Sequence, residues 1–183
     1  MRCPRGDAKL GLTEWTALGH QDQGLNNLGE LDKVASELRE KIDAFAPDVI
    51  ITWGPNGESG HPDHRLTDVV ASQVFFERHR LKHAPRKLYH FVDPESSMAH
   101  LPMQERKSKR QVADAFVTTA IEIKAQHTAT ANASYSCHVS QLSAEKKVAL
   151  ADPANAKPTT IYLRRVADST RNKREKTLFS GLK

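Results

Sequence analysis

The sequence predicts an α/β fold in which helices flank a mostly parallel sheet. Three observations lead to this fold class: an amphipathic helical pattern over residues 28–45, a β-branched run at 48–53, and a Gly-rich stretch at 54–60 that opens a second helical pattern. A helix, a buried strand, a loop and a helix in this order form the repeat of α/β proteins. The loops beyond the carboxyl ends of the strands carry the site in such folds, so the loop at 54–61 is the place to seek chemistry.

The first helix is expected to span residues 28–45. Asn27 is a suitable N-cap, and Glu30 three residues further on would complete a capping box. The helix must end near Ala46, because the residue before Pro47 disfavours helical geometry. One face of the helix collects its apolar residues, namely Leu28, Leu31, Val34, Ala35, Leu38, Ile42 and Phe45.

The run at 48–53 is typical of a strand that is buried on both faces of a parallel sheet, since it shows no polar alternation. A second helix is expected to start at Pro62 or Asp63 and to run to about Arg80. Pro is comfortable in a first helical turn, and an acidic side chain there complements the helix dipole. The residues expected to face inward are Leu66, Val69, Val70 and Val74.

Further strands are expected at 87–92, at 117–123 as an edge strand, and at 159–166, with a helix over 124–138. Residues 93–112 are polar and poorly periodic, so we expect a flap or excursion there. Residues 167–183 are expected to form a basic tail. The length of 183 residues fits one domain over the whole chain.

Composition indicates a soluble globular protein, with 38% hydrophobic and 27% charged residues. No apolar run approaches the roughly 18 residues of a transmembrane helix, and no apolar stretch follows the basic opening as in a signal peptide. A cytoplasmic location is therefore expected. Cys3 and Cys137 lack a CxxC spacing, and both are expected to stay reduced.

The net charge of +5 is concentrated at 78–87, 106–110 and 164–183. Such clusters can meet the phosphates of nucleic acids or lipids. No aromatic residues are interleaved in them for base stacking, so a solvated surface is the favoured interpretation and no nucleic-acid partner is expected. A basic nucleic-acid-binding protein stays open as the weakest alternative.

The densest cluster of ligand-type side chains is Gly60-His61-Pro62-Asp63-His64. Two imidazoles and a carboxylate within one turn, at a loop that follows a buried strand, can converge on a metal ion such as zinc. The HxHxDH loop of metallo-β-lactamase-like hydrolases is one candidate for this pattern. Aligned on His61 and His64, however, that loop places its first histidine at Ser59, so a required ligand is missing.

A second candidate fits better. The segment PDVIITWGPNGESGHPDHR resembles the second signature of the PIG-L/LmbE superfamily, the zinc-dependent N-deacetylases similar to GlcNAc-phosphatidylinositol de-N-acetylase. Other segments match that family in order along the chain. They are the LG passages at 10–12 and 18–22, the strand at 88–89, the segment at 117–123, Cys137-His138-Val139-Ser140-Gln141, and the terminal stretch 176–182.

The resemblance implies a Rossmann-like sheet, a bound zinc ion, and removal of an acetyl group from an N-acetylated amino sugar or a related small amide. It implies that His64 is a zinc ligand. It also implies that His61 stabilises the oxyanion or protonates the departing amine, and that Asp63 orients His61 and keeps it protonated. Asp22 and His138 would contact the substrate, although an ordinary turn carboxylate and a helix-end histidine stay open for them.

The HPDD motif, from which the family draws its other zinc ligands and its general base, does not occur in the sequence. We therefore expect a chain that lacks the family's N-terminal β-α-β portion, has an incomplete zinc site and is inactive alone. Loss of a central strand would also lower stability and favour association, so an oligomer is conceivable. The alternative function is a non-catalytic sugar-binding remnant of the deacetylase fold.

Overall fold

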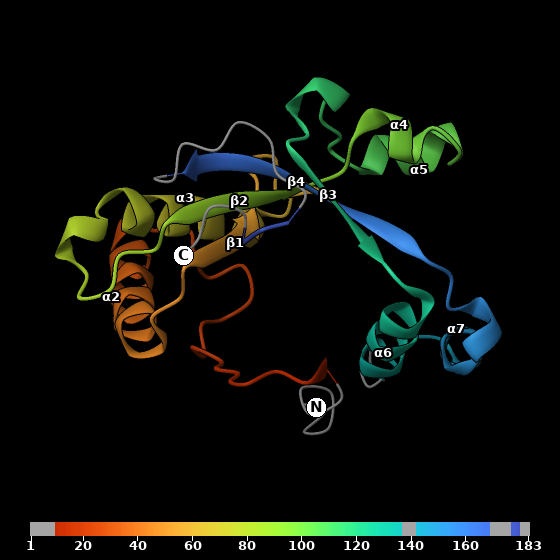
Figure 1. The fold of residues 1–183 in the computed structure, drawn as a ribbon, viewed down its shortest axis with the longest axis horizontal. Helices are drawn as coiled ribbons and strands as arrows, with labels where there is room; N and C mark the ends of the chain where they lie inside the picture. Colours follow the sequence, from red (N-terminus) through yellow and green to blue (C-terminus); the bar gives the residue numbers. More distant parts are fainter. Residues whose placement is uncertain (1–9, 137–141, 169–176, 180–183) are drawn as a thin grey trace. The chain divides into compact units, whose positions relative to one another are not determined.

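A computed structural model describes residues 10–136, 142–168 and 177–179 of the chain. The chain divides into two compact units, one formed by residues 1–17 and 122–161 and the other by residues 18–121 and 162–183. The Gly-His-Pro-Asp-His motif at residues 60–64 lies in the second unit. Figure 1 shows the order of the elements along the chain.

A mixed sheet runs through the fold, with the strand order β1-β2-β4-β3. Its strands are β1 (Val49–Trp53), β2 (Lys87–Val92), β3 (Thr119–Ile123) and β4 (Thr159–Asp168). β1 and β2 are parallel, with Ile51 opposite Tyr89, whereas β2 and β4 are antiparallel. The α/β class is confirmed, but the sheet is mixed, since β1 with β2 is parallel and β2 with β4 is antiparallel.

The first predicted helix is confirmed as α2 (Leu28–Phe45). The Asn27 side chain accepts a hydrogen bond from the Glu30 amide at 2.9 Å, as an N-cap does, and Ala46 ends the helix with φ 53°. The capping box is not completed in the expected way, because the Glu30 carboxylate lies 3.0 Å from His20 instead.

The second predicted helix is shorter than expected. α3 (Pro62–Phe76) ends before a separate 3-10 turn at Arg78–Arg80. Val70 and Val74 are buried as predicted, but Val69 is 51% exposed and was wrongly placed on the inner face. Val69 directly precedes Val70, and neighbouring residues on a helix point about 100° apart, so only one of them can face α2.

The core of the second unit lies between α2, α3 and β1. Ala35 and Ile42 of α2 pack against Val70 and Val74 of α3, and Ile50 of β1 adds a partly buried side chain. The expectation that β1 is buried on both faces is wrong, because Ile51 is 49% exposed. β1 lies at one edge of the sheet and so lacks the cover of a central strand.

The remaining elements follow the prediction in outline. β2 has the expected bounds, β3 lies at the other sheet edge as predicted, and β4 begins at the expected residue. The expected flap at 93–112 contains the short helices α4 (Glu95–Met98) and α5 (Met103–Ser108). The first unit holds α6 (Ala125–Tyr135) and α7 (Ala144–Ala151), the latter not predicted.

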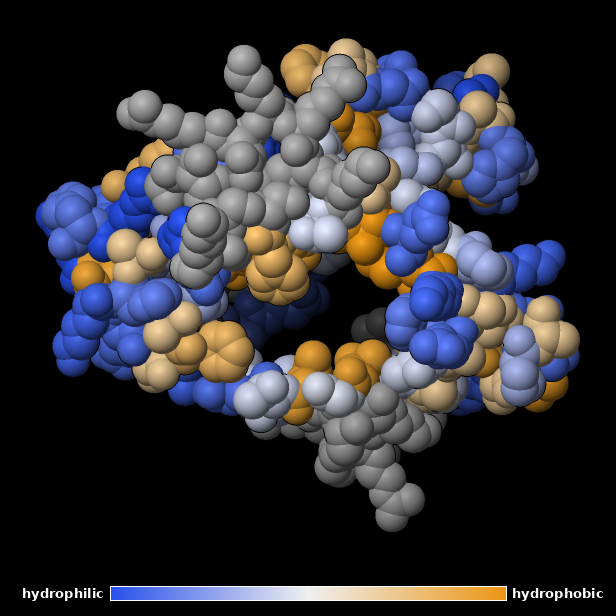
Figure 2. All heavy atoms as spheres, in the orientation of Figure 1, coloured by the Kyte–Doolittle hydropathy of each residue, from blue (hydrophilic) through white to orange (hydrophobic). Residues whose placement is uncertain are grey.

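None of the described helices is long and apolar enough to cross a membrane. Hydrophilic side chains cover most of the left part of Figure 2, the part of the view where α2 lies in Figure 1.

Candidate functional site

The loop that joins β1 to α3 carries the candidate site at the carboxyl end of β1. Its backbone turns sharply, with the Gly57 amide donating to the Gly54 carbonyl at 2.8 Å. Gly57 has φ 63°, and a Cβ there would lie 3.0 Å from the His61 carbonyl oxygen, so the turn requires glycine. His61 is the N-cap of α3, and Pro62 follows it in the first turn.

The two histidines of the motif make opposite hydrogen bonds through Nδ1. His64 Nδ1 lies 3.2 Å from the Gly57 carbonyl oxygen, which can only accept, so Nδ1 carries the proton and Nε2 the lone pair. His61 Nδ1 accepts the Asp63 amide proton at 3.2 Å, so the proton of the neutral ring is on Nε2. His64 thus presents the nitrogen that a metal ion needs, whereas His61 presents a donor.

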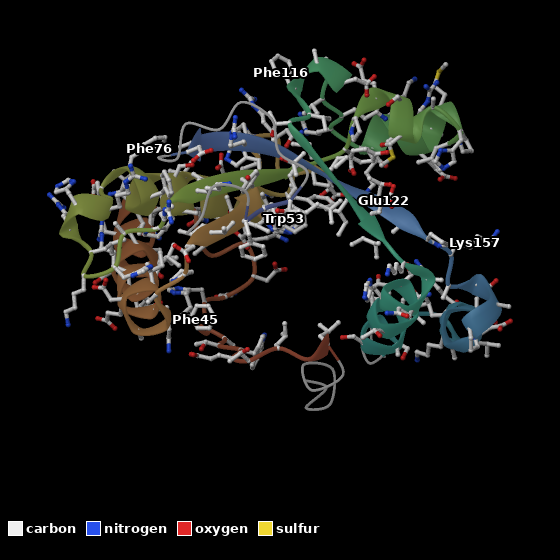
Figure 3. The ribbon with its side chains drawn as sticks, viewed as in Figure 1. Phe45, Trp53, Phe76, Phe116, Glu122 and Lys157 are labelled. Carbon is white, nitrogen blue, oxygen red and sulfur yellow. The ribbon has the colours of Figure 1, made fainter. Side chains whose placement is uncertain are left out.

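Trp53, the last residue of β1, fixes the plane of the His64 ring. The two rings stack with centroids 4.2 Å apart and an interplanar angle of 6°. Figure 3 labels Trp53 at the end of β1. Trp53 also contacts Phe91 edge to face, with ring centroids 5.7 Å apart. Stacking and the Nδ1 bond together restrict His64 to one orientation.

A turn before α2 brings another carboxylate group, that of Asp22, to this loop. Asp22 Oδ1 lies 3.8 Å from His61 Nε2, and the Asp22 side chain is 81% exposed. The Gln23 amide donates to Asp63 Oδ2 at 2.6 Å. The Asp63 carboxylate therefore holds the backbone of this turn, while its own amide holds the His61 ring.

Asp22, His61 and Asp63 form a possible metal-binding group. One nitrogen or oxygen atom from each lies within 4.8 Å of the others, and this is the one such group of three among the residues that the structure describes. Asp63 Oδ1 is buried without a hydrogen-bond partner, and such a carboxylate oxygen is suited to bind a cation. His64 is not a member of that group. His64 Nε2 could hold a cation in the tautomer described above, whereas this trio could hold one only if His61 gave up its Nε2 proton.

The expected flap contacts the site loop directly. The Arg110 amide donates to the Glu58 carbonyl at 2.6 Å, and Lys109 forms an ion pair with the Glu58 carboxylate. The Asn56 side chain donates to the Arg110 carbonyl oxygen. These three contacts fasten residues 109–110 to the loop that precedes His61.

The structure brings together four of the five predicted site residues: Asp22, His61, Asp63 and His64. His138 lies outside the described residues. The sequence analysis did not identify Trp53 or Gln23. Trp53 acts through ring stacking and Gln23 through its backbone amide, and neither kind of contact produces a recognisable sequence motif. The position of Trp53, one residue before the Gly-rich loop, was the available signal for an aromatic residue against the site.

Comparison with known proteins gives a family match that covers the residues of this site. Residues 5–75 match the family model described as PIG-L, GlcNAc-PI de-N-acetylase. A mycothiol S-conjugate amidase of Streptomyces coelicolor is 40% identical over 70 residues, which are 38% of this chain and 24% of the relative. A 1D-myo-inositol 2-acetamido-2-deoxy-alpha-D-glucopyranoside deacetylase of Thermobispora bispora is 28% identical over 173 residues, with 74% of this chain and 56% of the relative covered.

A deacetylase of the same description from Salinispora arenicola is 30% identical over 102 residues, which cover 48% of this chain. The chain spans between about a quarter and a little over half of the length of these relatives, from 24% to 56%. The matched residues 5–75 include Asp22, both motif histidines and Asp63.

Proposed function

Since the chain belongs to the PIG-L superfamily and its family match includes both site histidines, we propose that it forms part of the active site of a zinc-dependent hydrolase. The bond cleaved is the amide C–N bond of an acetamido group; water supplies one oxygen of the acetate product, the carbonyl supplies the other, and the nitrogen leaves as an amine. The substrate is an N-acetylated amino sugar or a related small amide. Relatives named for a deacetylase and an amidase support this class of reaction.

The observation that carries the proposal is that Nδ1 of His64 faces a backbone acceptor, whereas Nδ1 of His61 faces a backbone donor. Amide hydrolysis needs a cation near the carbonyl oxygen and a donor that can protonate the departing nitrogen. His64, with its lone pair on Nε2, suits the first task, and His61, with its proton on Nε2, suits the second. A bound zinc ion would polarise the carbonyl and lower the pKa of a coordinated water.

The chain's own residues divide the remaining work. The Asp63 amide holds the His61 ring so that Nε2–H points away from Nδ1 and toward the side where Asp22 lies. The exposed Asp22 carboxylate is suited to accept hydrogen bonds from sugar hydroxyl groups. Of the zinc ligands that the family resemblance implies, the sequence supplies His64, since it contains no HPDD string.

A metal titration tests this assignment. We expect Co²⁺ or Zn²⁺ titrated into the purified chain to bind through His64, so that His64→Ala weakens binding about tenfold or more. His79→Ala removes an exposed histidine outside the site and is the matched control. Weakening by His61→Ala and Asp22→Asn, but not by His64→Ala, would assign the cation to the Asp22–His61–Asp63 group instead.

The hydrolase proposal itself is tested by amine release from an N-acetylated amino sugar in the presence of zinc, measured on a polypeptide in which an HPDD-bearing segment is fused to the chain. Loss of release in His61→Ala, with metal binding retained, would support a donor role for His61. Binding of N-acetylglucosamine in the presence of a chelator, unchanged by His64→Ala, would favour a non-catalytic sugar-binding module.

A further inference from the structure

His20, outside the motif, lies between two carboxylates of α2. Its Nδ1 is 3.0 Å from Glu30 Oε2, and its Nε2 is 2.8 Å from Glu37 Oε2. The His20 side chain is 14% exposed, and both carboxylates are partly shielded. Each ring nitrogen of His20 thus lies within hydrogen-bond distance of one carboxylate oxygen of α2.

These contacts tie the segment before α2 to the helix, and Glu30 and Glu37 lie seven residues apart on one helix face. The opposite face of α2 packs on α3 through Ala35 and Ile42. The clamp of His20, Glu30 and Glu37 thus uses other side chains of α2 than the buried core residues Ala35 and Ile42.

The clamp is followed directly by the turn that reaches the site. The Gly24 amide donates to the Gln21 carbonyl at 2.9 Å, and a Cβ on Gly24 would lie 2.7 Å from that oxygen, so the turn needs glycine there. Gln23 is a non-glycine residue at φ 59°, a conformation that persists only where its surroundings impose it. This conformation aims the Gln23 amide at Asp63, 2.6 Å away.

The same turn carries Asp22 and borders an open polar cavity of about 530 Å³, which His20, Asp22 and Glu30 help to line. Two contacts anchor this turn: the clamp on α2 and the Gln23–Asp63 hydrogen bond. Asp22 lies between these two anchors in the sequence, and its carboxylate is 3.8 Å from His61 Nε2. Neither anchor is a contact of Asp22 itself, so its placement depends on them.

We propose that His20 is a positioning residue: by pairing with Glu30 and Glu37 it holds the 20–24 turn so that Asp22 faces His61 and the Gln23 amide binds Asp63. The role in binding an N-acetylated sugar rests on the proposed function. The placement of the turn does not, and the two can be measured separately.

The experiment compares His20→Leu, which removes both pairs, with His20→Arg, whose guanidinium can still donate to two carboxylates. We expect His20→Leu to speed hydrogen exchange of the Gln23 amide about tenfold or more, and to raise the Kd for N-acetylglucosamine several-fold. His20→Arg should restore both values, and Glu40→Gln, an exposed glutamate of the same helix, should change neither.

A Glu30→Gln/Glu37→Gln double variant keeps the imidazole and should reproduce the effect of His20→Leu even if the leucine variant folds poorly. Unchanged Gln23 exchange in both variants overturns the proposal, as does failure of His20→Arg to restore it. If the unaltered chain binds no N-acetylglucosamine, the proposed function fails, and Gln23 exchange still decides the role of His20.

Discussion

At the scale of single residues, the clearest effect of burial on charge lies at Asp93. This aspartate follows the last residue of β2, and burial raises the pKa of its carboxyl above the ordinary 3.8. The folded protein then holds the proton more tightly than the unfolded chain does. Stability therefore falls as the pH rises from about the ordinary pKa through the raised one, and above the raised pKa the full cost of the buried charge is present.

We predict that Asp93→Asn raises the melting temperature at neutral pH, because the amide avoids desolvation of a charge. The gain should shrink as the pH falls through the raised pKa, where the native carboxyl is protonated. Thermal melts from neutral to acidic pH measure this, with Asp32→Asn, an exposed aspartate of α2, as the control. A gain that is the same at every pH would contradict the assignment to charge burial.

The sequence predicted which side chains form the candidate site but not how each one is oriented. The short motif at 60–64 predicted His61, Asp63 and His64, because it shows both their residue types and their spacing. The partners that set the two tautomers are backbone groups, the Gly57 carbonyl and the Asp63 amide. Every residue has a backbone carbonyl, and nearly every residue has a backbone amide, so no pattern of side chains predicts which of these groups will contact a histidine ring.

At the scale of elements, the strength of a periodic signal decided what could be predicted. α2 was predicted with its bounds because seven apolar residues, a cap and a proline all agree. α7 was missed, since its eight residues are few for a period to emerge. The burial of β1 was overestimated because an apolar run cannot tell a central strand from an edge strand, which depends on partners distant in the sequence.

Periodicity also predicts which apolar residues share one face of a helix, but it does not predict which of them are buried against another element. Ile42 is 4% exposed in the core of α2 and α3, whereas Leu28, at the start of the same face, is 80% exposed. We predict that Ile42→Ala lowers the free energy of unfolding by about 2–5 kcal/mol. Leu28→Ala should change it by less than about 0.5 kcal/mol. Urea denaturation measures both, and equal losses would mean that α2 does not pack on α3 through this face.

At the scale of the whole molecule, the edge of the sheet formed by β1 carries apolar side chains. No strand pairs with its outer side among the residues that the structure describes. Ile51 is half exposed and lines an open cavity of about 310 Å³ with Trp53 and Phe91. An unpaired strand edge with apolar side chains offers both backbone partners and a surface for another chain.

We therefore predict that the chain associates as its concentration rises, with β1 at the contact. Ile51→Lys should shift the equilibrium toward the monomer, because a charged residue on an edge strand opposes pairing. Ala120→Lys adds the same charge to β3, the strand at the opposite edge, and should leave association largely unchanged. Light scattering coupled to gel filtration over a range of concentrations measures the mass of each variant. Equal effects of the two lysines would assign the change to net charge, and a monomer at every concentration would mean that the β1 edge does not associate.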